Sequence, residues 1–174
     1  AAQRASCQAF CVEVCNQMDK EPFFIQSRNS DVDRGYQSNK TYYWARDCAC
    51  PGRLVTPPPD TICVVVDVDY YLDMNKQLTQ YFQPHILYTF TPHSAACSSG
   101  DYVYTWTQSG ELDVEVCGGG KFRHKLWDYS VDHFLAWNSG NCALYYVDRR
   151  SCGHHSMILL TPVARWAFPF SMSL

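Results

Sequence analysis

One short stretch constrains the fold of this chain more than any other. From Thr61 to Tyr71 the sequence reads TICVVVDVDYY, and residues 62–66 form an unbroken run of apolar, mainly β-branched side chains. Such a run is typical of a strand buried on both faces, as in the middle of a parallel sheet. The sequence therefore predicts an α/β domain built around this strand.

Two carboxylates follow the apolar run directly. Asp67 and Asp69 are two residues apart, so both point to the same side if the strand continues. Like charges at the end of a buried strand are costly unless a ligand uses them. Open α/β sheets bind ligands at the carboxyl ends of their strands, which makes both residues candidates for a ligand site. In the simpler alternative, Asp67 caps a turn and Asp69 is solvated.

The bulk composition limits the classes of function. The 174 residues suffice for one domain with a substantial core, and 47% hydrophobic and 15% aromatic residues exclude a disordered tail. Fourteen basic against 17 acidic residues give a net charge of -3, so there is no general attraction to nucleic acid. Any contact with RNA has to be local. No apolar run approaches the length of a membrane span, and no signal peptide is visible.

The ten cysteines do not resemble a disulfide framework. Cys7, Cys11 and Cys15 recur every four residues, which stacks them on one face of a helix. We interpret most cysteines as small buried apolar residues in a reducing compartment. A zinc site formed by Cys48, Cys50 and a later Cys or His is an alternative, although structural zinc sites usually have a CxxC spacing.

Periodicity and turn residues predict a mixed order of elements. The expected elements are a helix over 2–18, strands over 23–26, 41–45 and 62–66, a helix over 74–82 with Asp73 as its N-cap, a strand over 86–91, an antiparallel hairpin over 102–108 and 112–117, a short helix from Ser130 to Trp137, and strands over 142–147 and 157–160. Arg149-Arg150 and Thr161-Pro162 are expected to end the last two strands. The strand, helix, strand order around residues 62–91 fits a βαβ crossover.

The densest basic cluster of the chain follows three glycines at 118–120. Lys121 and Arg123, together with Phe122 and Trp127, are candidates to hold phosphates and to stack a purine. The glycines do not form a GxGxxG or P-loop pattern. A basic hairpin tip without a ligand is the simpler alternative.

Five blocks resemble, in the same order, the N-terminal capping region of nodavirus RNA replicases. They read KTYYWARD, VVVDVDYY, QPHILYTFTP, VEVCGGGKFRHKLWDY and HHSMILLTPV. That region is a methyltransferase and guanylyltransferase distantly related to the alphavirus capping enzyme. The resemblance implies a single domain over residues 1–174 with a divergent Rossmann-like methyltransferase fold, a mixed central sheet and an antiparallel hairpin insertion. Because the chain begins at Ala1 without a methionine, we expect it to be a fragment of a longer viral replicase.

The resemblance also implies a chemistry. In this family GTP is methylated at N7 with S-adenosylmethionine as the donor, and m7GMP then passes through a covalent histidine adduct to the 5′ end of viral RNA. The first step depends mainly on positioning. The second needs a nucleophilic imidazole and cations, such as Mg2+, around the triphosphate. The family histidine lies about two helical turns before the helix arginine, which places it upstream of Ala1.

Individual residues match the family to different degrees. Asp47, the last residue of KTYYWARD, matches the acid tied to binding of the methyl donor. Arg4, in AAQRAS, matches the arginine on the first helix, and we assign both residues to the catalytic site. Asp67 and Asp69 are assigned to cofactor binding. Phe122 stands where the nodaviruses compared have a tryptophan, and a phenylalanine still stacks.

Partners and location follow from the same resemblance. It implies GTP, the RNA 5′ end, other replicase subunits in a ring-like homo-oligomer, and host membranes reached through segments outside this chain. The location would be the host cytoplasm, on replication membranes such as the mitochondrial outer membrane. Two other classes stay open, namely a non-catalytic scaffold of the replicase and a metal-dependent phosphotransferase or nuclease that uses Asp67 and Asp69.

Overall fold

The computed structural model describes residues 2–26, 42–44, 57–67, 69–90, 102–108, 111–116, 118–124, 126–152 and 155–167. The helices are α1 (Ala2–Gln17), the 3-10 turn η1 (Asp69–Tyr71) and α3 (Met74–Gln80). The strands are β1 (Glu21–Gln26), β2 (Tyr42–Trp44), β3 (Thr61–Val66), β4 (His85–Phe90), β5 (Tyr102–Trp106), β6 (Leu112–Val116), β7 (Lys121–His124), β8 (His133–Asn138), β9 (Asn141–Cys152) and β10 (His155–Ala167).

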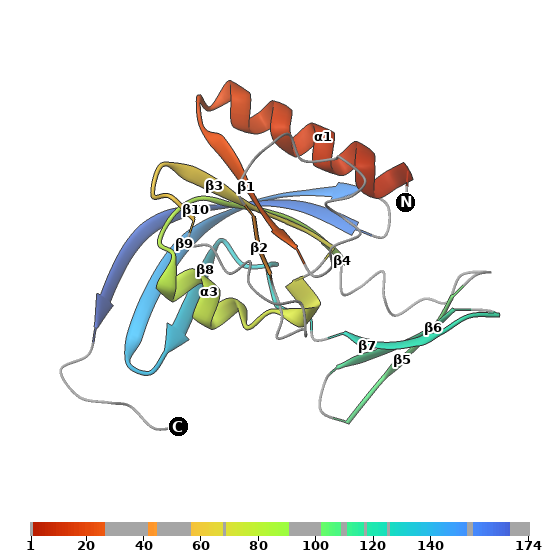
Figure 1. The fold of residues 1–174 in the computed structure, drawn as a ribbon. Coiled ribbons are helices and arrows are strands. Elements are labelled where there is room, and N and C mark those ends of the chain that lie inside the picture. Colours follow the sequence, from red (N-terminus) through yellow and green to blue (C-terminus); the bar gives the residue numbers. More distant parts are fainter. Residues whose placement is uncertain are drawn as a thin grey trace.

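A seven-stranded mixed sheet forms the body of the protein (Figure 1). Its strand order is β2-β1-β3-β4-β10-β9-β8, in which the first four strands are parallel and the last three pair antiparallel. Every residue of β3 is buried, as the apolar run predicts. β3 and β4 are parallel neighbours separated by η1 and α3, which confirms the βαβ order. The predicted α/β class and mixed sheet are therefore correct.

Alternate residues of β3 pack into two separate cores, one on each face of the sheet. Ile62 and Val64 belong to the cluster under α1, together with Cys11 and Cys15. Cys63 and Val65 instead join the cluster on the opposite face, which contains Met74 and Leu78 of α3. Figure 1 shows α1 and α3 on opposite sides of the sheet. The burial of β3 thus depends on both helices.

The cysteines of α1 behave as predicted from their spacing. Cys11 and Cys15 are fully buried, and Cys7 packs at the border of the same cluster. Burial raises the pKa of the Cys11 thiol to about 12 and that of the Cys15 thiol to about 11. The neighbouring thiols add a smaller contribution at Cys11, and Glu21 does so at Cys15. These groups therefore stay protonated near neutral pH and act as apolar side chains. No helix in the described ranges is long and apolar enough to cross a membrane.

A second, three-stranded antiparallel sheet has the order β5-β6-β7. It confirms the predicted hairpin and extends it by β7, which the basic composition of residues 121–124 did not reveal. Leu112 and Val114 form its small core, against which Tyr104 and Leu126 pack. Figure 1 shows this sheet beside the main body, close to the end of β4.

The prediction of a helix from Ser130 to Trp137 is wrong, because β8 occupies most of this segment. Phe134 and Ala136 are buried whereas Leu135 is exposed, so burial alternates with the period of a strand. A two-residue turn joins β8 to β9, with φ of 51° at Ser139 and 81° at Gly140. Positive φ at both positions is the type I′ geometry that favours hairpins. The Asn-Ser-Gly sequence at 138–140 was the local signal for this turn.

The last two strands are longer than predicted. Arg149 and Arg150 do not end β9, and Thr161-Pro162 does not end β10. β10 loses β4 as a partner after Leu160, and its pairing with β9 shifts register near Pro162. Proline is tolerated in a strand at such an edge or bulge, because no ladder bond to the missing neighbour is lost.

Candidate functional site

Several elements meet at one edge of the main sheet. Because β1, β2, β3 and β4 are parallel, their carboxyl ends share this edge. β10 pairs antiparallel with β4, so its first residue, His155, lies opposite Phe90 at the same edge. Figure 1 shows the N-terminus of α1 on the side toward which β1 and β3 run. We call this edge the carboxyl edge, and it is where open α/β sheets bind ligands.

Asp67 is the carboxylate of this edge that a ligand can reach. The chain leaves β3 at Asp67 with a φ of 59°, and its backbone N–H donates to the Tyr88 carbonyl at 2.9 Å. The Tyr70 hydroxyl donates to Asp67 Oδ1 at 2.9 Å, and His155 Nε2 lies 3.6 Å from the same oxygen. The Asp67 side chain is still 28% exposed. It is therefore both oriented by neighbours and open to solvent.

Asp69 lies in a different environment. It begins η1 and is fully buried, so the expectation of two carboxylates aligned along one extended strand is wrong, and so is the alternative of a solvated Asp69. The Thr89 hydroxyl donates to Asp69 Oδ2 at 2.7 Å, whereas Oδ1 has no partner among the described residues. Burial, with a smaller contribution from the charge of Asp67, raises the pKa of Asp69 to about 8, and the hydrogen bond from Thr89 opposes this shift. Asp69 is therefore mainly protonated at neutral pH.

Aromatic side chains surround the two acids. The Tyr88 and His155 rings stack with centroids 4.4 Å apart and planes inclined by 5°. Trp127 Nε1 donates to the Asp69 carbonyl at 3.1 Å, which ties the segment after β7 to η1. The Tyr129 hydroxyl is buried without a partner in the described part of the chain, and burial and the charge of Asp69 hold its pKa well above the usual range. Among the described residues, the site therefore combines the accessible carboxylate of Asp67 with a flat aromatic stack.

The predicted phosphate-binding residues lie elsewhere, on the second sheet. Lys121 and Arg123 are exposed on β7, where they line a shallow pocket with residues of β5 and β6. Arg123 Nε and Nη2 donate to the two carboxylate oxygens of Asp113 at 2.8 and 3.2 Å. This bidentate bond lowers the pKa of Asp113. A phosphate would have to compete with Asp113 for Arg123. Phe122 pairs with Val114 in the ladder, and its side chain lies outside the described part.

Other predicted residues are placed only in part. Arg4 belongs to the first turns of α1, but its side chain is not among those described. Asp47 lies outside the described residues; it follows, by three positions in the sequence, the last residue of β2. Cys48 and Cys50 of the alternative zinc site lie outside them as well. Across the described ranges, no group of three or more His, Cys, Asp or Glu side chains is arranged to hold a metal ion.

Two residues of the site were not predicted from the sequence. Thr89 is a buried polar residue near the end of β4, HILYTF, and His155 is the first residue of β10. A hydroxyl in an apolar strand usually has a partner, which was the only local signal for Thr89. For His155 the sequence held no signal that it would meet Asp67, since the contact depends on the pairing of β10 with β4.

Comparison with known proteins decides the family. The family model described as Nodavirus Vmethyltransferase matches residues 1–138. The chain belongs to this nodavirus methyltransferase family. It is also 32% identical over 171 residues, or 96% of its length, to the RNA-directed RNA polymerase of Pariacoto virus. The corresponding protein of Pieris rapae virus is 29% identical over 170 residues, and that of Flock house virus is 31% identical over 99 residues.

The matched region is a small part of these relatives. The chain spans 17% of the length of the Pariacoto virus polymerase and 16% of that of Pieris rapae virus. The family and the relatives together identify a methyltransferase-like domain of a viral replicase, which indicates a role related to RNA capping.

Proposed function

We propose that this domain binds S-adenosylmethionine and GTP at the carboxyl edge and methylates GTP at N7, as the first step of viral cap formation. The observation that carries the proposal is the pair Asp67 and Asp69. At the end of the central strand, one carboxylate is accessible and oriented, and the other is buried beneath it. This arrangement occurs in a chain of a methyltransferase family, at the edge where α/β sheets bind nucleotides.

The side chains at the carboxyl edge fit the chemistry of the methyl donor. S-adenosylmethionine, when bound, supplies a methyl group on a positively charged sulfonium, and it also carries hydroxyl and amino donors. Asp67 can accept hydrogen bonds from such donors and can offset a positive charge. The stacked rings of Tyr88 and His155 offer an aromatic surface beside it. Asp69 is too deeply buried to contact a ligand, so we assign it to holding η1, and thereby Asp67, in place.

The residues of this chain would act mainly by positioning. Methyl transfer needs two ligands held in line and shielded from water, without an acid or base of unusual strength. Arg4 starts from α1 and Asp47 follows β2, and both elements reach the carboxyl edge. We therefore propose that Arg4 and Asp47 complete the site around Asp67.

The later steps are a proposal for the longer replicase. Transfer of m7GMP through a histidine adduct to the RNA 5′ end requires a nucleophilic imidazole and cations around the triphosphate. We propose that another part of the longer replicase supplies this histidine. Assembly with other replicase subunits on host membranes likewise remains a proposal.

Calorimetric titration with S-adenosylmethionine tests the methyl-donor site. We expect the parent chain to bind, and Asp67→Asn and Asp47→Ala each to weaken binding at least tenfold, since each removes a charge-assisted hydrogen bond worth about 1.5–3 kcal/mol. Asp148→Asn serves as the matched control, because Asp148 is an exposed acid of the same sheet. Transfer of a radiolabelled methyl group to GTP then tests the reaction. Equal binding by the parent and Asp67→Asn would contradict the assignment of Asp67.

A metal-dependent phosphotransferase or nuclease is less well supported. Such a site needs two or more carboxylates around one ion, but Asp69 is buried with one oxygen bonded to Thr89. Asp73, the next acid along the chain, is the N-cap of α3 and accepts a hydrogen bond from the Lys76 N–H. Nuclease activity that depends on Mg2+ and ignores the methyl donor would favour this alternative.

A further inference from the structure

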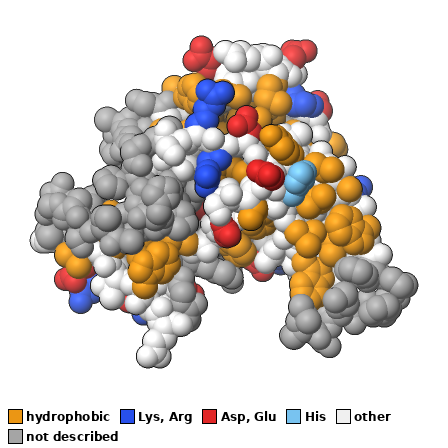
Figure 2. Space-filling view, turned by 180° about the vertical axis from the view of Figure 1, so that it is seen from behind, with side chains coloured by type: hydrophobic (Ala, Val, Ile, Leu, Met, Phe, Trp, Pro, Cys, Tyr) orange, Lys and Arg blue, Asp and Glu red, His pale blue; other side chains and the backbone are white. Residues whose placement is uncertain are grey.

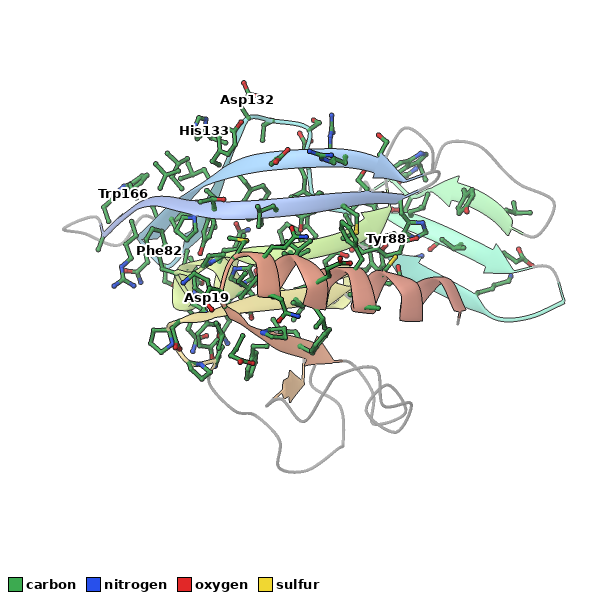
Figure 3. The ribbon with its side chains drawn as sticks, turned by 90° about the horizontal axis from the view of Figure 1, so that it is seen from above. Asp19, Phe82, Tyr88, Asp132, His133 and Trp166 are labelled. Atoms are coloured by element: carbon green, nitrogen blue, oxygen red, sulfur yellow. The ribbon has the colours of Figure 1, made fainter. Side chains whose placement is uncertain are left out.

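Three strands project beyond the rest of the main sheet. β4 pairs with β10 only as far as Leu160, yet β10 continues to Ala167 alongside β9. We call β8, residues 141–147 of β9 and residues 160–167 of β10 the wing. Figure 1 shows the wing extending away from β3 and β4, and Figure 3 shows Trp166 at the opposite end of the sheet from Tyr88.

One face of the wing is covered by α3. Phe134, Ala136 and Tyr145 belong to the same buried cluster as Leu78 of α3. The Tyr145 hydroxyl donates to the Leu78 carbonyl at 2.7 Å and also lies 3.1 Å from the Tyr81 carbonyl. This face is therefore a normal part of the domain core.

The other face is apolar but uncovered. The pairing aligns Leu135 with Leu144 and Ala164, and Cys142 with Trp166. His133 and Tyr146 pair across the same face, with ring centroids 5.7 Å apart. Leu135, Tyr146 and Trp166 are 53%, 49% and 41% exposed. In Figure 2 the wing lies on the right, where hydrophobic side chains dominate the surface.

α1 lies on the same side of the sheet but does not extend to the wing. Its cluster includes residues of β1, β3 and β4, and its border with β10 is formed by Met157 and Leu159. The wing strands are thus apolar on both faces, with a helix on only one. Strands with near-continuous apolar sequence are typical of sheets covered on both faces, and large exposed apolar patches mark interaction surfaces.

We propose that the uncovered face of the wing is the docking surface for the polypeptide that directly follows this chain in the full-length replicase. The relatives have more than four fifths of their length outside the matched region, since the match covers 17% and 16% of them. The last described residues of β10, including Trp166, lie on the wing itself. A following segment is therefore separated from this surface by residues 168–174 alone, whereas a preceding segment would join α1 near the carboxyl edge.

The chemistry of the surface defines what the segment must offer. The face presents Leu135, Leu144, Tyr146 and Trp166. His133 and Thr161 are its polar side chains, and the exposed Asp148 lies at its border on β9. The face fits an apolar segment, such as one face of an amphipathic helix, better than a charged partner.

Hydroxyl-radical footprinting tests the proposal by comparing the 174-residue chain with the replicase in which its natural downstream sequence is retained. We expect oxidation of Trp166 and Tyr146 to fall severalfold in the longer protein. Trp106, which is 43% exposed on the second sheet against 41% for Trp166, should be oxidised equally in both and is the matched control. Equal oxidation of Trp166 in both proteins would overturn the proposal.

Two further outcomes are informative. Protection of Trp166 in the 174-residue chain that increases with protein concentration would mean that a second copy covers the face, which would also overturn the proposal. Leu135→Ser should restore oxidation of Trp166 in the longer protein. Val103→Ser, at a strand residue 44% exposed on the second sheet, should not. Because these readouts do not involve the methyl donor, the proposal can fail or succeed independently of the methyltransferase function.

Discussion

The buried carboxyl of Asp69 should make the stability of this domain fall as the pH rises. Its pKa is raised to about 8 in the folded chain by burial, whereas an unfolded Asp titrates near 3.9. Between these two values the folded state holds a proton that the unfolded state has lost. The stabilisation is therefore complete below about pH 4 and is lost as the pH rises to about 8.

The size of the effect follows from the pKa difference. Below the folded pKa, each pH unit changes the unfolding free energy by about 1.4 kcal/mol. The two units between pH 6 and the folded pKa of about 8 therefore lower the unfolding free energy by about 3 kcal/mol, and this loss is complete at pH 9. Asp69→Asn keeps the shape of the side chain and an oxygen for the Thr89 hydroxyl, but cannot ionise. Between pH 6 and pH 9, the unfolding free energy of the variant should therefore rise by about 3 kcal/mol relative to that of the parent.

Urea unfolding at pH 6, 7.5 and 9 measures this difference for the parent and Asp69→Asn. Other groups titrate in both proteins, so the comparison of the two pH profiles isolates Asp69. Asp148→Asn, at an exposed position, should follow the parent profile. Parallel profiles for the parent and Asp69→Asn would refute the reasoning, because they would mean that Asp69 has the same ionisation state in the folded and unfolded chains.

Three further predictions concern other parts of the fold. His85 is fully buried, and burial lowers its pKa to about 4. The stability that its neutral form contributes above about pH 6.5 should therefore be lost as the pH falls toward 4. The unfolding free energy of His85→Gln should depend less on pH over this range than that of the parent. Asp73→Ala should lower the unfolding free energy by about 1 kcal/mol through loss of the α3 N-cap, whereas Asp73→Asn, which retains a capping oxygen, should change it little in the same urea titration. Ser139→Gly should raise the thermal midpoint, because glycine adopts the positive φ of this turn without the strain of about 1 kcal/mol that a side chain adds; a lowered midpoint would contradict the turn geometry.

Local sequence was sufficient where each element carries its own signal. The cysteine repeat of α1, the Asp73 cap of α3 and the alternation in β5 all depend on residues within a few positions of one another. Their prediction needed no knowledge of distant partners. β8 shows the opposite case, because its residues can be read as a helix, and only the turn at Ser139 and Gly140 and the pairing with β9 make it a strand.

The features of the candidate site likewise separate into those that local sequence predicted and those that depend on distant partners. The apolar run before Asp67 was enough to predict a central buried strand with a ligand site at its carboxyl end, since a β-branched run of that length has few other stable solutions. The sequence could not show that Asp67 stays accessible while Asp69 is buried, or that the basic residues of β7 lie on a separate sheet. The different environments of the two acids depend on Thr89 and His155, which approach the acids only after β4 and β10 have paired. The position of the basic residues depends on the pairing of β7 with β6. The ionisation of a carboxylate is set by its burial and neighbours, and these are properties of the tertiary structure.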